Sequence, residues 1–343
     1  MATTYKHVDA ASEGGGDGST WATSGGTAAY TEAEFEACLE GGAQTGYVYF
    51  VKGSQTYTLA DSSYDASACD ATAAEPCTII GVKTATTNTG SNVVFSDWET
   101  IGSATRPTFA CGASYTILLG DYFKVFNIIF TGAATFILTT SNYCIIYNCE
   151  STNSSGAASR TAFAGANSIF ISCKAKSGAG HAFNVGASTK MIFCYAYESL
   201  TGYLLTAAAN LLFNIADDCT TGFSESADGN ILGFGNTIHN STTGVAGTTG
   251  GGHAWINNII DTATDGFKWT TQTDSNFFAY NHAGNSVTEL YDTTIPLTST
   301  ELHSDKWETS GDPKFTNAAG HDFSLGSDSP CIDAGMTITL GVG

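Results

Sequence analysis

Carboxylate and imidazole side chains recur at one fixed interval in the second half of the chain. Asp217, His239 and Asp261 follow one another at intervals of 22 residues, and Asp218 lies beside the first. If the interval is one coil of a stacked repeat, carboxylates two coils apart lie about 10 Å from each other. That is close to the spacing of the acid and base of inverting glycosidases. These four residues are the predicted catalytic site; the structural alternative is that they are polar side chains tied to turn amides.

Charged and tyrosine side chains form a second recurring set that we expect on the outer face. They fall in two columns: Glu150, Lys174 and Tyr195 in one, and Lys176, Tyr197 and Asp218 in the next. Tyrosines beside mixed charges can hold a sugar. The same surface could instead contact another protein or be a solvated sheet face with cross-strand pairs. All of these residues except Asp218 are predicted binding residues.

Three cysteines occupy a further column. Cys149, Cys173 and Cys194 are bounded by Ile128 and Ile215, at similar intervals. An interior column of this composition uses cysteine as a small apolar residue, so we expect stacked free thiols. A disulfide is an alternative, although parallel Cβ atoms fit its torsion badly. A metal-binding or nucleophilic role is the other alternative.

The remaining cysteines and histidines give weak signals. The ten cysteines match no zinc spacing. Cys69 and Cys77 bound the loop-like stretch CDATAAEPC and could form a local disulfide. His181, His253 and His321 each follow a glycine and are assigned to turns. No metal site or cofactor is predicted, and a Ca²⁺ site has no clear motif.

A repeat of about 22 residues must position these side chains. A polar residue, most often asparagine, follows each short apolar run at intervals of 21 to 24 residues. The positions, polar except for Phe193, are Asn127, Asn148, Ser172, Phe193, Asn214, Asn236, Asn258 and Asn281. The apolar runs are short and the segments between them are rich in turn residues, which predicts strands and turns without helix. Such a unit is one coil of a parallel β-helix, with asparagines stacked as a side-chain ladder.

Both ends depart from the repeat. Residues 31–41 hold the one convincing helix, because Thr31 and Glu34 form a capping box and Gly41 stops it. The predicted organisation is an N-terminal cap at 1–45, a parallel β-helix at 46–290 and an irregular C-terminal tail at 291–343. A cap protects the first coil because an exposed sheet edge invites aggregation.

The two ends also resemble a known group of proteins. YKHVDAASEGGGDGSTWATSGG, GYVYFVKGSQTYTL and DPKFTNAAGHDFSLGSDSPCIDAG look like the opening and closing segments of right-handed parallel β-helix proteins. That superfamily includes polysaccharide lyases and hydrolases, bacterial surface proteins and phage tailspike and virion proteins. The resemblance implies an all-β, single-stranded right-handed β-helix. Hydrolases of this fold use an Asp–Asp pair and a His, but their glycine-flanked His and Arg-x-Lys element are not found here.

The composition of the chain limits the kinds of partner that it can bind. Acidic residues outnumber basic ones by 32 to 12, giving a net charge of −20 over 343 residues. This charge disfavours nucleic acids and anionic membrane surfaces. It also disfavours a polyanionic sugar unless cations bridge. No apolar run approaches the length of a membrane helix, and the first residues lack the pattern of a secretory signal.

Two classes of function remain. An extracellular-type composition without a signal or a complete catalytic motif favours a non-enzymatic structural virion protein of a phage, a capsid decoration or spike-like appendage. We then expect a homotrimer that assembles in the host cytoplasm, contacts other virion proteins and has polysaccharide as a further candidate partner. The alternative is an extracellular polysaccharide-degrading enzyme, a glycoside hydrolase before a lyase. A cellular adhesin is a third possibility.

Overall fold

The computed structural model describes most of the chain. The described residues are 4–19, 21, 29–40, 45–58, 64–67, 69, 71–83, 105–112, 116–226, 229–247, 252–270, 276–284, 287, 289–291 and 311–334. They form two compact units, residues 1–183 and 184–343. The predicted helix stop at Gly41 and much of the predicted tail lie outside the described residues.

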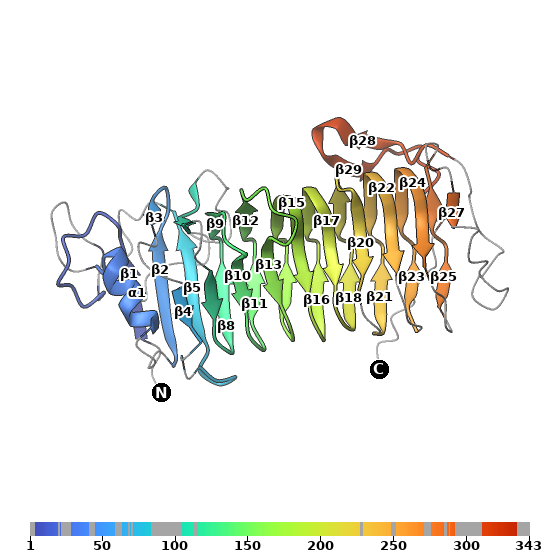
Figure 1. Ribbon diagram of the computed structural model, residues 1–343. Helices are drawn as coiled ribbons and strands as arrows, with labels where there is room; N and C mark the ends of the chain where they lie inside the picture. Colours follow the sequence, from blue (N-terminus) through green and yellow to red (C-terminus); the bar gives the residue numbers. More distant parts are fainter. Residues whose placement is uncertain are drawn as a thin grey trace. The chain divides into compact units, whose positions relative to one another are not determined.

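The first unit is a stack of parallel strands in three rows (Figure 1). The first row is β1 (Thr4–Val8), β2 (Tyr47–Lys52), β5 (Cys77–Val82), β8 (Phe123–Phe126), β11 (Ile145–Tyr147) and β14 (Ile169–Ile171). The second is β3 (Thr56–Thr58), β6 (Thr108–Ala110), β9 (Ile129–Gly132), β12 (Glu150–Asn153) and β15 (Lys174–Val185). The third is β4 (Tyr64–Ala66), β7 (Ile117–Leu119), β10 (Phe136–Thr140) and β13 (Thr161–Gly165). Helix α1 (Glu32–Glu40) begins at the Thr31–Glu34 capping pair.

The second unit repeats the arrangement. Its first row is β16 (Thr189–Ile192), β18 (Ala209–Leu212), β21 (Ile231–Phe234), β23 (Ala254–Ile256) and β25 (Phe277–Ala279). The second is β17 (Tyr195–Leu205), β19 (Ile215–Asp217), β22 (Thr237–Gly247), β24 (Ile259–Trp269) and β26 (His282–Ala283), and the far halves of its long strands pair with β20 (Thr221–Glu225) and β27 (Glu289–Tyr291). Each strand pairs in parallel with the next coil, which confirms the predicted all-β parallel solenoid.

A short antiparallel hairpin near the C-terminus is the exception to the parallel pairing of the described strands. It consists of β28 (Phe315–Asn317) and β29 (Asp322–Leu325), joined by a 3₁₀ turn at Ala318–Gly320. The hairpin folds back over the second row of the second unit (Figure 1). It carries residues that are distant in sequence onto the outer face of that row.

An asparagine ladder runs through the interior of the second unit. In Asn214, Asn236 and Asn258, each backbone N–H and side-chain N–H donates to the Oδ1 of the next asparagine, the last being Asn281, at 2.8–3.1 Å. Each Nδ2 also donates to a backbone carbonyl, as Asn236 does to Leu211. The three amides are fully buried. Such a ladder satisfies polar groups that would otherwise be costly to bury.

The register of this ladder differs by one residue from the predicted column. Met191 pairs with Leu211 and Ile192 with Leu212, so Phe193 aligns with Phe213 and Cys194 with Asn214. Phe193 and Phe213 both have positive φ, at 55° and 56°. In the first unit, by contrast, asparagine itself occupies the left-handed bend. Because asparagine suits both positions, residue type alone could not fix the register.

The cysteine column is buried and reduced. Cys149, Cys173 and Cys194 are free thiols with almost no exposure. Their Sγ atoms contact backbone carbonyls, such as that of Ile146 at 3.3 Å from Cys173. Burial raises the pKa of Cys149 far above its usual value, which disfavours the nucleophilic thiolate. Cys69 and Cys77 are also free thiols, so the local disulfide considered above is not present.

Candidate active site

One outward column of the second unit collects the predicted catalytic residues. Asp217 pairs in register with His239, and His239 with Asp261. Their neighbours Ile238 and Ile260 are fully buried in the interior. Because successive side chains of a strand point to opposite faces, the column faces outward. Tyr197 precedes Asp217 in this column, so the predicted alignment of Tyr197 with Asp218 is wrong by one residue.

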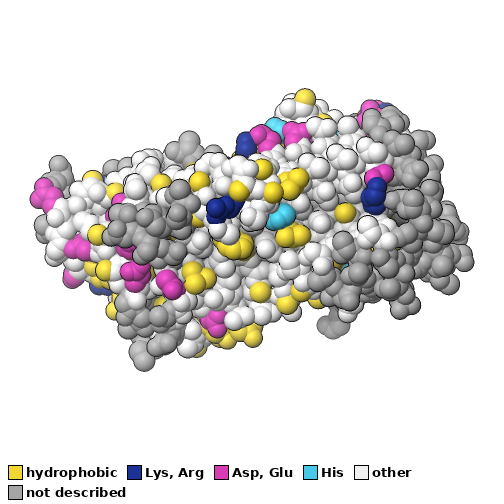
Figure 2. Space-filling model, in the orientation of Figure 1, with side chains coloured by type: hydrophobic (Ala, Val, Ile, Leu, Met, Phe, Trp, Pro, Cys, Tyr) yellow, Lys and Arg dark blue, Asp and Glu magenta, His cyan; other side chains and the backbone are white. Residues whose placement is uncertain are grey.

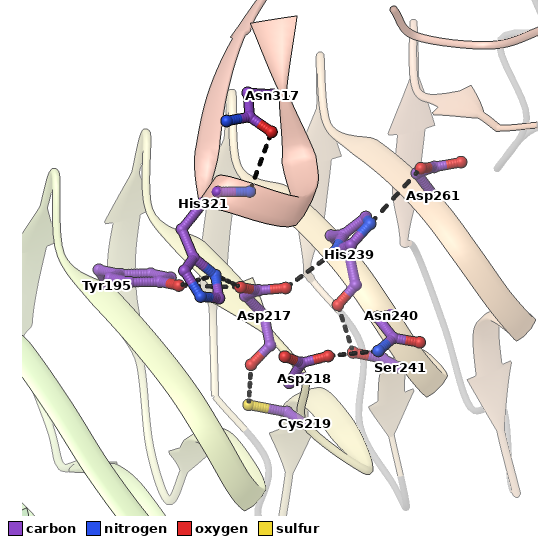
Figure 3. A network of polar contacts seen from close by, with 11 residues as sticks. Tyr195, Asp217, Asp218, Cys219, His239, Asn240, Ser241, Asp261, Asn317 and His321 are labelled. Carbon is purple, nitrogen blue, oxygen red and sulfur yellow. Dashed lines mark hydrogen bonds and ion pairs between the residues drawn. The ribbon is translucent and has the colours of Figure 1, made fainter. Parts of the chain in front are cut away.

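Asp217 is the centre of the cluster (Figure 3). Its side chain is only 1% exposed. Oδ1 lies 2.8 Å from Nδ1 of His239. Oδ2 accepts from the Tyr195 hydroxyl at 2.8 Å and lies 2.6 Å from Nδ1 of His321. A buried carboxylate is thus held by two imidazoles and one phenol, which compensates the cost of burying its charge.

His239 is oriented by this contact. With Nδ1 against Asp217, its Nε2 faces Asp261, whose Oδ2 is 4.0 Å away. Phe323 and Phe315 pack against the imidazole with centroid distances of 5.2 and 6.4 Å. The side chain keeps 18% of its surface exposed. A carboxylate that fixes one ring nitrogen and leaves the other available is the arrangement that orients general acid–base histidines.

Asp261 sits beside a glycine that makes room for it. Gly284 is the next residue along the column, and a Cβ there would lie 2.0 Å from Oδ1 of Asp261. That distance is far below van der Waals contact. The Asp261 side chain is 17% exposed. The absence of a side chain at Gly284 therefore leaves the space that the Asp261 carboxylate occupies, and the carboxylate stays partly exposed to solvent.

His321 reaches the site from the hairpin. It follows the 3₁₀ turn at the tip, with φ of 60° in the left-handed region. Nδ1 contacts Asp217 and lies 3.0 Å from the Tyr195 hydroxyl. Its side chain is 48% exposed. The ring nitrogen away from Asp217 thus lies on the solvent side.

The hydrogen bonds of the cluster favour a charged pair. The bond to Asp217 raises the pKa of His239 against the opposing effect of burial. For Asp217, burial would raise the pKa, but the hydrogen bonds from His239, Tyr195 and His321 outweigh it and the pKa is lowered. Burial and the bond to Asp217 raise the pKa of Tyr195 well above its usual value. The phenol therefore stays protonated and donates to the carboxylate.

A polar groove runs next to the column. It has a volume of about 420 Å³ and is lined by Asp218, Cys219, Thr220, Asn240, Ser241, Thr242, Thr262, Ala263 and Thr264. Asp218, Asn240 and Thr262 occupy matching left-handed bends on three successive coils. The Asn240 amide donates to the Asp218 carboxylate. Hydroxyl, amide and carboxylate groups in a row can exchange hydrogen bonds with sugar hydroxyls.

The predicted binding residues divide between the two units. Glu150 and Lys174 pair in register in the first unit, and Lys176 follows two residues later, all partly buried. In the second unit, Tyr195 bonds to Asp217, and its ring stacks on that of Tyr197 at 5.4 Å. Tyr195 is thus part of the same cluster as the predicted catalytic residues.

Figure 2 shows a surface with few charged side chains, mostly isolated from one another among uncharged groups.

Among the described residues, no group of three or more His, Cys, Asp and Glu side chains has an arrangement that could hold a metal ion. No described helix is long and apolar enough to cross a membrane.

Comparison with known proteins finds similarity at the level of fold. No family model matches the sequence. No curated protein matches it either. Among solved structures, pectate lyase Pel9A is 12% identical, covering 98% of this chain and 93% of its own, with a TM-score of 0.47. The PL6 family alginate lyase AlyGC is 10% identical over 79% of this chain and 41% of its own, with a TM-score of 0.49. A PL6 family polysaccharide lyase from Pseudopedobacter saltans is 8% identical, covering 81% and 89%, with a TM-score of 0.38.

These structures correct the predicted function. All three are polysaccharide lyases with the right-handed parallel β-helix fold, which confirms the resemblance. They contradict the prediction of a non-enzymatic virion protein and accord better with the polysaccharide-degrading alternative. The likeness itself is one of fold, so the chemistry of this chain must be argued from its own residues.

Proposed function

We propose that this chain is a polysaccharide-degrading enzyme that hydrolyses uncharged glycans at the outward column of its second unit. The observation that carries the proposal is the buried Asp217, which holds His239 by Nδ1 and turns its Nε2 toward Asp261. A carboxylate and an oriented imidazole meet there beside a groove lined by polar side chains. Sites that combine a cleft with hydrogen-bonded titratable groups are typical of catalysis.

In this mechanism Asp261 is the general base. It is open to solvent and can accept a proton from the water that attacks the anomeric carbon. His239 lies next to it, with Nε2 4.0 Å from Oδ2, and orients the carboxylate. Asp217 does not touch the substrate, because it is buried; it positions His239 and balances the imidazolium charge. Asp218 and the neighbouring bends supply the binding groove.

The charge of the site selects the substrate class. Asp218 lines the groove, Asp261 lies in the adjoining column, and no described Lys or Arg lines the groove. A uronate carboxylate bound there would be repelled by both aspartates. A neutral sugar has no such penalty, and its hydroxyls match the threonine and asparagine groups. The proposal is therefore hydrolysis of a neutral polysaccharide rather than elimination on a uronate.

The test is a substrate panel with product analysis. The full chain is incubated with neutral polysaccharides (arabinan, galactan, xylan, mannan and glucan) and with pectate and alginate. The proposal expects new reducing ends from at least one neutral glycan, without the absorbance of an unsaturated uronate. Asp261→Asn should abolish the release. Cleavage of pectate or alginate alone, with unsaturated products, or no cleavage at all, would contradict it.

A further inference from the structure

The Asp217 carboxylate holds two imidazoles, one on each oxygen. His239 approaches Oδ1 and His321 approaches Oδ2, both through Nδ1. Their Nδ1 atoms lie 2.8 and 2.6 Å from oxygens of the same carboxyl group. Both remaining Nε2 atoms are therefore directed away from Asp217.

We infer that His321 is the general acid of this site, donating a proton from Nε2 to the glycosidic oxygen as the bond breaks. The inference rests on the proposed hydrolytic function and adds a residue to it. In one turnover, water attacks the anomeric carbon and gives a proton to Asp261. The bond from that carbon to the glycosidic oxygen breaks, and the oxygen takes the proton from His321. The sugar product gains OH at the anomeric carbon, and the leaving chain gains H.

Three observations favour this role over a purely structural one. His321 is 48% exposed, so it gains little from packing. It comes from the hairpin, 104 residues after Asp217, yet it is aimed at the buried carboxylate rather than at solvent. The Tyr195 hydroxyl also lies 3.0 Å from Nδ1, so two groups fix the ring on one edge and leave the other edge open.

The geometry also separates the acid from the base. His321 and Asp261 lie on opposite sides of the Asp217–His239 pair (Figure 3). The acid is thus held at the coil of Asp217 and the base stands two coils further on. Acid and base therefore lie apart, as they do in inverting glycosidases.

The test compares leaving groups in the full chain with His321→Asn, because asparagine tolerates the left-handed conformation of this position. The substrates are the neutral polysaccharide that the wild type cleaves best and the 4-nitrophenyl glycoside of the same sugar. Polysaccharide kcat should fall by about 100- to 1,000-fold, with KM within about threefold. On the aryl glycoside, loss should stay under about tenfold, because nitrophenolate leaves without protonation.

Asp328→Asn is the matched control. It removes the exposed Lys314–Asp328 ion pair of the hairpin segment without touching the site, and it should keep wild-type kinetics on both substrates. Equal losses on the two substrates in His321→Asn would overturn the inference by showing a structural role. Unchanged polysaccharide kcat would also overturn it while leaving the proposed function standing. A wild type that cleaves no glycan would overturn both.

Discussion

Two polar columns run along the same coils of the second unit, one inside and one outside. The inner one is the asparagine ladder at 214, 236, 258 and 281, and the outer one includes Asp217, His239 and Asp261, each three residues after an asparagine of the ladder. Inside, the amides bond one another and the backbone. Outside, the column changes side-chain type at each coil, from Tyr197 to Asp217, His239 and Asp261.

The contrast between the uniform inner column and the varied outer column distinguishes residues that stabilise the repeat from residues that act in catalysis. Identical side chains can satisfy each other at every step, so a uniform ladder serves stability. A column of unlike titratable groups cannot be explained in this way. It requires the added Tyr195 and His321 to balance Asp217, and it keeps His239 and Asp261 partly open. We expect substitutions in the two columns to separate stability from activity.

The largest effect is expected in the outer column, from Asp261→Asn. Loss of the general base should lower kcat on a neutral polysaccharide by about 1,000-fold. The unfolding free energy should stay within about 0.5 kcal/mol of the wild type, since the side chain is partly exposed. Initial rates measure kcat, and urea denaturation measures the unfolding free energy. A variant that loses stability in proportion to activity would contradict the division between the columns.

In the inner column, Asn236→Ala should instead lower the stability of the protein and leave its activity unchanged. This change leaves the N–H groups of Asn214 and the carbonyl of Leu211 without their buried partner. The unfolding free energy should fall by about 3 kcal/mol, measured by urea denaturation. Asn210→Ala on the exposed face of the neighbouring strand β18 is the control and should cost under about 0.5 kcal/mol. Similar losses of unfolding free energy in both variants would show that the ladder does not contribute specially to stability.

Asp217→Asn tests the link between orientation and charge. It should lower kcat by about 100-fold, as for a residue that orients another. Its effect on stability depends on pH. The lowered pKa of Asp217 gives stability that is present above about pH 3.9 and lost as the pH falls through the folded value. The raised pKa of His239 gives stability that is present below about pH 6.5 and lost as the pH rises through its folded value.

The stability difference between wild type and Asp217→Asn should therefore be largest between about pH 4 and 6.5. Urea denaturation across this range measures it. A difference that grows steadily toward alkaline pH would show that the imidazolium is not part of the interaction.

The smallest effect is expected from Gly284→Ala. The added methyl group would stand against Oδ1 of Asp261 and displace the carboxylate. We expect kcat to fall by about tenfold through misplacement of the base. Gly156→Ala, where a Cβ meets nothing within 4 Å, is the control and should change nothing. Unchanged kinetics in Gly284→Ala would show that the position of Asp261 is not critical.

Sequence periodicity predicted the coil and the outer column well, because both depend on local spacing. The 22-residue interval placed Asp217, His239 and Asp261 on neighbouring strands, and the structure pairs them in register. The ladder was predicted one residue out of register at Phe193. Asparagine is suited to the left-handed bend and to the ladder, and only strand pairing distinguishes the two.

His321 could not have been predicted to join the site. It follows a glycine at a turn, as the sequence indicates, but its place depends on how a non-repeating segment folds back. No period connects it with Asp217. The packing of Phe323 and Phe315 on His239 could not be predicted from the sequence for the same reason.

Whether the outer column is the active site is tested by the release of reducing ends from a neutral polysaccharide, expressed per folded molecule. Wild type, His239→Gln and Asn236→Ala are compared at a temperature where all three are folded. We expect Asn236→Ala to cleave at the wild-type rate and the rate of His239→Gln to be lower by at least about 100-fold. Cleavage by His239→Gln at the wild-type rate would contradict the claim that the outer column is the active site.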